Sequence, residues 1–414
     1  LTAERVSLRG SVGTATAAQL RLRVALGPLL AGRMDARDLV LRGVDIRLPW
    51  KPGAAGPGLG KAVLALSAPD WLSRVSARIE GGRLVVGEKV FTDIDATLAT
   101  SDATGTYMAA GTAKSGGQGW HFTARLSRPG GDGAVGLDLA VDGQGKLAGL
   151  GATLTGQVAR DGTLAGRVAG RGPDLSQLLP APAVPFRAEG RVSIAGGLAV
   201  ADQLTGEIGG APASGAVALR LDRQPRLDVA VTASRLDLDA WAPALLRAAS
   251  GGLRGLPVGI DLSAEAAQLA GGTLRRLRGA FDIGDGAVIV REARAVLPGD
   301  AMLRLTGRVE SGEGGLRLEG AASLWAPALR TTLSWTGGSR DGGLPPLALR
   351  SARLSGHVVA DAQGVAIDRM TGTLDGGPVA GGVRLLLGPQ PQLQASLSLD
   401  RLDLDPWLPE ALPS

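Results

Sequence analysis

Residues 204 to 246 read LTGEIGGAPASGAVALRLDRQPRLDVAVTASRLDLDAWAPALL, and residues 370 to 412 read MTGTLDGGPVAGGVRLLLGPQPQLQASLSLDRLDLDPWLPEAL. The two segments align without a gap at an offset of 166 residues, which pairs Trp241 with Trp407. The chain therefore contains a duplicated module. A catalytic site rarely needs copying, whereas a surface that must be lengthened does. The repeat favours a structural or conduit role over an enzyme.

Apolar and polar residues alternate through the repeat. The stretch RLDVAVTAS at 226 to 234 places Leu227, Val229 and Val231 on one side of a strand and polar side chains on the other. Gly-rich turns separate such stretches at the spacing of consecutive antiparallel strands. The same alternation recurs at 39–48, 83–98, 136–147, 281–290, 301–310, 315–324 and 391–399. We expect a mostly β protein, with an elongated, curled antiparallel sheet that forms an apolar groove.

Helical segments are few and short, and we expect them to cap the ends of β modules. The candidates are 68–75, 173–179, 239–250, 323–335 and 405–412. Asp239 and Asp405 precede or begin such segments, so we predict that they cap helices. The expected divisions are an N-terminal β segment at 1–51, a linker at 52–67, a β module at 68–185, the first repeat copy at 186–250, a β module with a Pro-Gly strand pair at 251–340, and the second copy at 341–414.

Composition excludes several classes of function. The chain has 414 residues, 64 Gly, 3% aromatic residues and no Cys, so disulfide scaffolds and thiolate metal sites are excluded. The net charge is +5, but the arginines are spread along the strands without stacking aromatics, which argues against nucleic acid. Solvated strand faces are the favoured interpretation, with attraction to anionic lipid headgroups as a weaker one.

Sequence motifs give no support for a catalytic, metal or cofactor site. The stretch GPGLGKA at 56 to 62 lacks the Gly and the Ser or Thr of a phosphate loop, and a linker is favoured. His121 and His357 have no partners at metal-ligand spacing. The aspartates of the two DLD triplets, 237/239 and 403/405, are candidate cation ligands, but Asp239 and Asp405 have a capping role available and no further acidic ligands cluster nearby. We therefore predict no metal, no cofactor and no enzymatic activity.

The duplicated LDLDAWAP and LDLDPWLP segments, taken with three further stretches, make the chain similar to the periplasmic part of an AsmA-family protein of a Gram-negative bacterium. The stretches are RLRVALGPLLAGRMDARDLVLRGVDIRLPW at 21–50, ARIEGGRLVV at 77–86 with the following TDIDATL, and AVLPGDAMLRLTGRVE at 295–310. The resemblance implies attachment to the inner membrane through an upstream segment, and a part in outer-membrane assembly with components of that process as partners. It also implies phospholipid transport between the membranes. Because the chain begins with Leu1, we expect a signal or anchor segment upstream.

A sheet with one apolar face must cover that face. Either a second sheet makes a closed sandwich, or acyl chains of lipids lie against a curled sheet. We predict that Leu227, Val229 and Val231, with Leu393 and Leu397 in the second copy, line a lipid groove. The alternatives are a scaffold or adhesin-like β-solenoid without lipid, which the long repeat period disfavours, and a carbohydrate-active enzyme, for which aromatic platforms and a carboxylate pair are missing.

Overall fold

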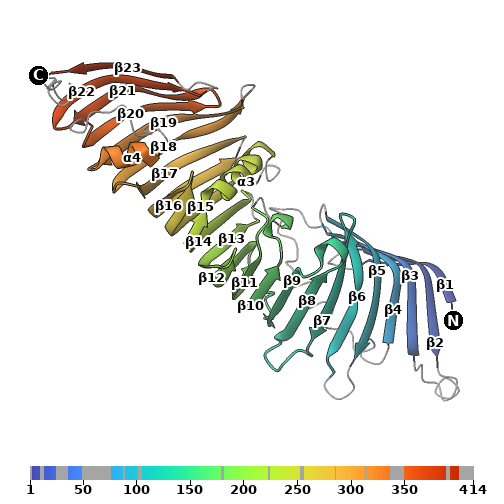
Figure 1. Ribbon diagram of the computed structural model, residues 1–414. Helices are drawn as coiled ribbons and strands as arrows, with labels where there is room; N and C mark the ends of the chain where they lie inside the picture. The colour runs from blue at the N-terminus through green and yellow to red at the C-terminus, as the bar shows by residue number, and fades with distance from the viewer. Residues whose placement is uncertain are drawn as a thin grey trace, which may run out of the picture. The chain divides into compact units, whose positions relative to one another are not determined.

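The structure is a computed structural model, and its elements are shown in Figure 1. The residues that it describes are 2–9, 14–24, 36–48, 76–86, 89–100, 105–178, 181–221, 224–251, 256–284, 286–312, 315–335, 349–387 and 392–400. The proposed linker at 52–67, the helix predicted at 68–75, the helix predicted at 405–412 and Asp405 all lie outside these residues.

The protein is mostly β, as the alternation predicts. Its 23 strands belong to one largely antiparallel sheet, which is not closed in the described part of the chain. The chain divides into two compact units. The first unit holds most of residues 1–210, the second holds most of residues 226–414, and strand β13, Ala211–Arg220, is shared between them.

The first unit is built of twelve strands that lie side by side in chain order (Figure 1). They are β1 Thr2–Arg9, β2 Thr14–Val24, β3 Ala36–Leu48, β4 Ser76–Val86, β5 Lys89–Thr100, β6 Tyr107–Ser115, β7 Gln118–Leu126, β8 Val135–Gly143, β9 Gly151–Val158, β10 Leu164–Gly172, β11 Phe186–Ala195 and β12 Leu198–Ile208. The segment predicted as a helix at 173–179 contains only a 3-10 turn, Leu175–Gln177. Asp174 caps this turn by accepting from the Ser176 amide.

The second unit continues in the same way with ten strands and two helices (Figure 1). The strands are β14 Arg226–Asp237, β15 Val258–Leu269, β16 Gly272–Gly284, β17 Ala287–Leu297, β18 Ala301–Gly312, β19 Gly315–Ala326, β20 Ala352–Asp361, β21 Gly364–Leu374, β22 Gly377–Leu386 and β23 Gln392–Leu399. The helices are α3 Leu238–Gly251 and α4 Leu329–Trp335.

Among the strands described, two neighbouring pairs are parallel, and a parallel pair cannot be joined by a tight hairpin. Strands β14 and β15 are parallel and α3 forms the connection between them. Strands β3 and β4 are also parallel, and the residues that join them lie outside the described ones. The other pairs whose register is described are antiparallel; some, such as β11 and β12, are joined by a short turn, and others, such as β10 and β11, by a longer connection.

The helix predicted over 323–335 is partly wrong. Residues up to Ala326 finish strand β19, and the helix α4 begins only at Leu329. Leu324 and Ala326 stand opposite Leu354 and Ala352 of β20, so cross-strand pairing of apolar side chains outweighs the local helical tendency.

The duplicated module is longer than its sequence similarity indicates. Strands β11, β12 and β13 have the same bounds as β20, β21 and β22 after a shift of 166 residues, and β14 and β23 begin at the same shift. The two quoted segments start at Leu204 and Met370, and the matching strands begin further upstream, at Phe186 and Ala352. Even a bulge between Glu189 and Arg191 recurs between Ser355 and His357.

Candidate functional site: the apolar face of the sheet

The residues predicted to line a groove share one face of β14. Leu227, Val229 and Val231 are half-buried, whereas Ala230 and Thr232 between and beyond them are exposed on the other face. The side-chain period of a strand is two, so this burial pattern follows directly from the alternation in the sequence. We call the side that carries Leu227, Val229 and Val231 the apolar face and the opposite side the polar face.

Strand register extends the apolar face across the whole second unit. Starting at Leu227 in β14, the residue directly opposite on each next strand is apolar, until the row reaches Leu393 in β23. The row runs Leu227, Val258, Ile283, Val288, Val309, Leu318, Ala360, Val365, Leu385 and Leu393. The two ends of this row are the two equivalent positions of the sequence repeat.

A second row lies beside the first and is equally free of polar side chains. It runs Val229, Ile260, Phe281, Val290, Gly307, Gly320, Val358, Ile367, Val383 and Ala395. Val231 stands opposite Leu262 in the next row, and Leu397 stands opposite Gly381 at the far end of the sheet. The structure therefore places all five predicted residues on one face.

Most of this face is only half covered. In the row from Leu227 to Leu393, Val258 alone is fully buried, while Leu385 is 36% and Leu393 70% exposed. A strand of a β-sandwich buries its inner face against a second sheet. In the described part of the chain there is a single sheet, so no second sheet covers these residues. The closed-sandwich alternative does not describe this fold.

Helices cover one margin of the apolar face. Leu238 and Trp241 of α3, and Leu329, Leu333 and Trp335 of α4, pack with a buried cluster that includes Leu236, Ala267, Leu274, Leu297, Ala301, Ala326 and Ala352. The Trp335 indole N–H donates to the carbonyl oxygen of Leu269 at 3.2 Å, and the Thr332 hydroxyl donates to that of Pro298 at 2.8 Å. Apolar packing holds both helices at this margin, and the two hydrogen bonds hold α4 in addition.

The glycines that recur in the repeat let neighbouring strands approach each other closely. A Cβ at Gly206 would lie 1.9 Å from the Arg187 carbonyl oxygen, and a Cβ at Gly372 would lie 1.9 Å from that of Arg353. Gly215 and Gly381 meet the oxygens of Ala230 and Ser396 in the same way, at 2.2 and 2.0 Å. Gly206, Gly215, Gly372 and Gly381 all belong to the apolar face. Neighbouring backbone occupies the space of the missing Cβ, so any larger residue at these positions would collide with it.

The first unit has a matching apolar face that the sequence analysis did not single out. One row crosses ten strands from β2 to β11 without a polar residue. It runs Leu22, Leu39, Ala77, Leu98, Ala109, Ala124, Leu139, Leu154, Val168 and Gly190. The alternation in each strand was visible in the sequence, but the register that aligns ten of them was not.

The polar face carries ion pairs along and between strands. Arg226 Nε lies 2.6 Å from an Asp228 carboxylate oxygen, and its Nη2 lies 2.7 Å from Asp282 of β16. The hydrogen bonds that Arg226 donates to Asp228 and to Asp282 raise the pKa of Arg226 above its usual value. Each such exposed pair contributes little to stability, and the main effect of these pairs is to keep the polar face hydrated.

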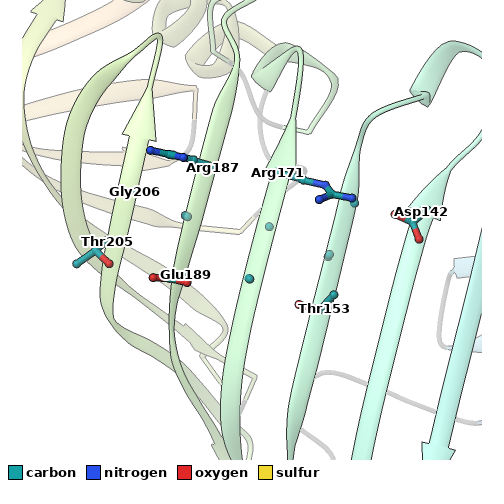
Figure 2. Close-up of a pocket in the computed structure, with 12 residues that line it drawn as sticks. Asp142, Thr153, Arg171, Arg187, Glu189, Thr205 and Gly206 are labelled. Carbon is teal, nitrogen blue, oxygen red and sulfur yellow. The ribbon is translucent and has the colours of Figure 1, made fainter.

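A hollow of about 510 Å3 lies over β8 to β12 in the first unit. Figure 2 shows its labelled side chains, with Arg187 and Glu189 on one strand and Thr205 and Gly206 on the next. At its edge the hollow is lined by Asp142 and not by the apolar-face neighbour Val141, so it belongs to the polar face. Two arginines and two acids line it, and their charges cancel.

The predicted capping role of Asp239 is wrong. Helix α3 begins at Leu238, one residue earlier than expected, so Asp237 occupies the capping position and accepts from the Ala240 amide at 3.1 Å. The Asp239 carboxylate instead accepts from the Ala270 amide, at 3.1 and 3.0 Å, and holds the turn between β15 and β16. Both carboxylates of this triplet therefore have structural partners.

Among the described residues no group of His, Asp and Glu could hold a metal ion. His121 is exposed on β7, and His357 lies 3.5 Å from Glu319. Of the described helices, none has the length and apolar character that crossing a bilayer requires. Comparison with family models, curated proteins and solved structures finds no match for this chain.

Proposed function

We propose that this protein shields or conducts phospholipid acyl chains along the apolar face of its sheet. The observation that carries the proposal is the pair of ten-strand rows without a polar side chain, left half covered by the protein itself. An apolar face of this extent needs a cover other than water. Acyl chains supply that cover without sequence-specific contacts, which matches a face made of Ala, Val, Leu and Gly.

The free energy needed to expose acyl chains to water supports this role. A diacyl lipid with about 30 methylenes costs on the order of 24 kcal/mol to expose to water, at about 0.8 kcal/mol per methylene. A continuous apolar row removes that cost at each step along the sheet, while the headgroup stays in solvent. The helices α3 and α4 cover one margin of the face and leave the rows from Leu227 and Val229 for lipid.

The biological setting follows from the resemblance to the AsmA family. We propose a non-enzymatic periplasmic protein of outer-membrane biogenesis, held at the inner membrane through a segment outside this chain. Its partners would be phospholipids and components of outer-membrane assembly. The repeat of 166 residues fits this role, because duplication lengthens a conduit.

Two matched double variants test the proposal. Val229→Asp with Val231→Asp places charge on the apolar face of β14, and Gln394→Asp with Ser396→Asp places the same charge at exposed positions on the polar face of β23. We expect phospholipid to co-purify with the wild type and with the polar-face variant, and to be lost from the apolar-face variant. Native mass spectrometry reads out the bound lipid, and circular dichroism verifies that β structure is retained.

A third variant separates lipid loss from unfolding. Leu393 is 70% exposed in the last strand, so Leu393→Asp leaves stability nearly unchanged and should still weaken lipid retention. Equal lipid content in the wild type and in both apolar-face variants would reject the proposal and leave a scaffold without lipid.

A further inference from the structure

A second hollow, of about 1020 Å3, lies on the second unit over β14 to β21. Like the hollow of the first unit, it belongs to the polar face. In most strands it is lined by three successive residues, of which the outer two are on the polar face. At β14 it is lined by exposed Thr232 alone and not by the apolar-face neighbour Ala233.

Arginines dominate the lining of this hollow, which we call the arginine trench. Arg278, Arg294 and Arg304 stand directly opposite one another on β16, β17 and β18. Arg276 and Arg353 also line it, and the single acid in the lining is Glu265. Five cations against one anion give the trench a formal excess of +4, in contrast to the balanced hollow of the first unit.

Few of these arginines are neutralised. Arg294 and Arg304 share one carboxylate, that of Glu292, at 2.8 and 3.3 Å. In the described part of the chain Arg276, Arg278 and Arg353 have no carboxylate within ion-pair distance. Two other arginines of this unit have two partners each: Arg226 pairs with Asp228 and Asp282, and Arg291 pairs with Asp261 and Asp282.

The trench also holds apolar side chains that are out of place on a polar face. Met302 is 47% exposed and Trp325 is 39% exposed, and the two stand opposite each other on β18 and β19. Arg353 of β20 stands opposite Trp325 on its other side. Hydroxyl groups extend the row of arginines on both sides, from Ser263, Ser323, Ser355 and Thr371.

We propose that the arginine trench binds the phosphate headgroup of an anionic phospholipid at a membrane surface. Guanidinium groups bind phosphate oxygens through paired hydrogen bonds, and the neighbouring hydroxyls are further donors. An exposed Trp beside cations is typical of a membrane interface, where the ring contacts the acyl boundary and the cation contacts the headgroups. A soluble anion would use the arginines and leave Met302 and Trp325 without a role.

This site is separate from the apolar face, which lies on the other side of the same strands. Loss of lipid from Val229→Asp with Val231→Asp therefore tests the proposed function, and variants of the trench test the present inference. The proposed function and the trench proposal can therefore be rejected independently of each other.

Flotation with vesicles tests the trench. The wild-type protein is mixed with vesicles of phosphatidylcholine that contain phosphatidylglycerol, and with vesicles of phosphatidylcholine alone. The trench variant carries Arg278→Gln, Arg294→Gln and Arg304→Gln. The control variant carries Arg125→Gln, Arg167→Gln and Arg384→Gln, which are exposed, dispersed over three strands, outside the trench and equal in charge change.

We expect binding to the anionic vesicles only, with about a hundredfold weaker partitioning for the trench variant and a loss of about threefold or less for the control. Trp325→Ala should weaken binding at high salt, where the electrostatic part is screened. Equal losses in the trench and control variants would overturn the proposal. So would binding of inorganic phosphate by calorimetry without any vesicle binding, which would assign the trench to a soluble anion.

Discussion

At the scale of single residues, the glycines of the apolar face carry most of the structural information. Gly206 and Gly372 are equivalent in the repeat, and each meets the carbonyl oxygen of an equivalent arginine, Arg187 or Arg353. Glycine recurs at this position because, without a side chain, it leaves room for the neighbouring backbone. The sequence predicted which side of β14 is apolar, but it offered no signal that these glycines were anything more than turn residues.

Adding a methyl group at these positions should be costly. We expect Gly206→Ala and Gly372→Ala each to lower the free energy of unfolding by about 2 kcal/mol, as overpacking does, because the backbone oxygen cannot move away as a side chain would. Urea unfolding measures the change. Gly131→Ala is the control, since nothing lies within 4 Å of its added Cβ, and it should change stability by less than about 0.5 kcal/mol. Similar changes in the free energy of unfolding for all three variants would contradict the view that neighbouring backbone fills the space of the missing Cβ.

At the scale of elements, the alternation predicted the strands better than it predicted the helices. Strands expected at 301–310 and 315–324 are β18 and β19, each slightly longer than expected. The helix expected from residue 323 failed because Leu324 and Ala326 have apolar partners on β20, which local sequence does not reveal. Helix α3 begins one residue earlier than expected, so the capping position falls to Asp237 and not to Asp239.

Hydrogen exchange distinguishes the capping role of Asp237 from the turn contact of Asp239. Asp237→Ala removes the cap of α3 and should cost about 1 kcal/mol, with faster exchange of the amides in the first helical turn. Asp239→Ala should leave that turn protected and speed exchange at Ala270, whose amide loses its acceptor. Faster exchange in the helix for Asp239→Ala, with none for Asp237→Ala, would restore the assignment made from the sequence.

At the scale of the whole molecule, the decisive property is register. The part of the chain that the structure describes contains 23 strands. What alternation alone leaves open is which residues of neighbouring strands stand opposite each other, because a slip of one residue would turn each apolar side to the other face. The register aligns ten apolar residues between Leu227 and Leu393, and ten more between Leu22 and Gly190.

The central claim is that acyl chains occupy the apolar face, and site-specific photo-crosslinking tests it most directly. A photoreactive residue is placed at Leu318 or Ile367 on the apolar face, and at Glu319 or Asp368 beside them on the polar face. After irradiation in the presence of phospholipid, mass spectrometry identifies the adducts. The account predicts lipid adducts at Leu318 and Ile367 and few at Glu319 and Asp368. Equal yields at all four positions, or adducts at none, would contradict it.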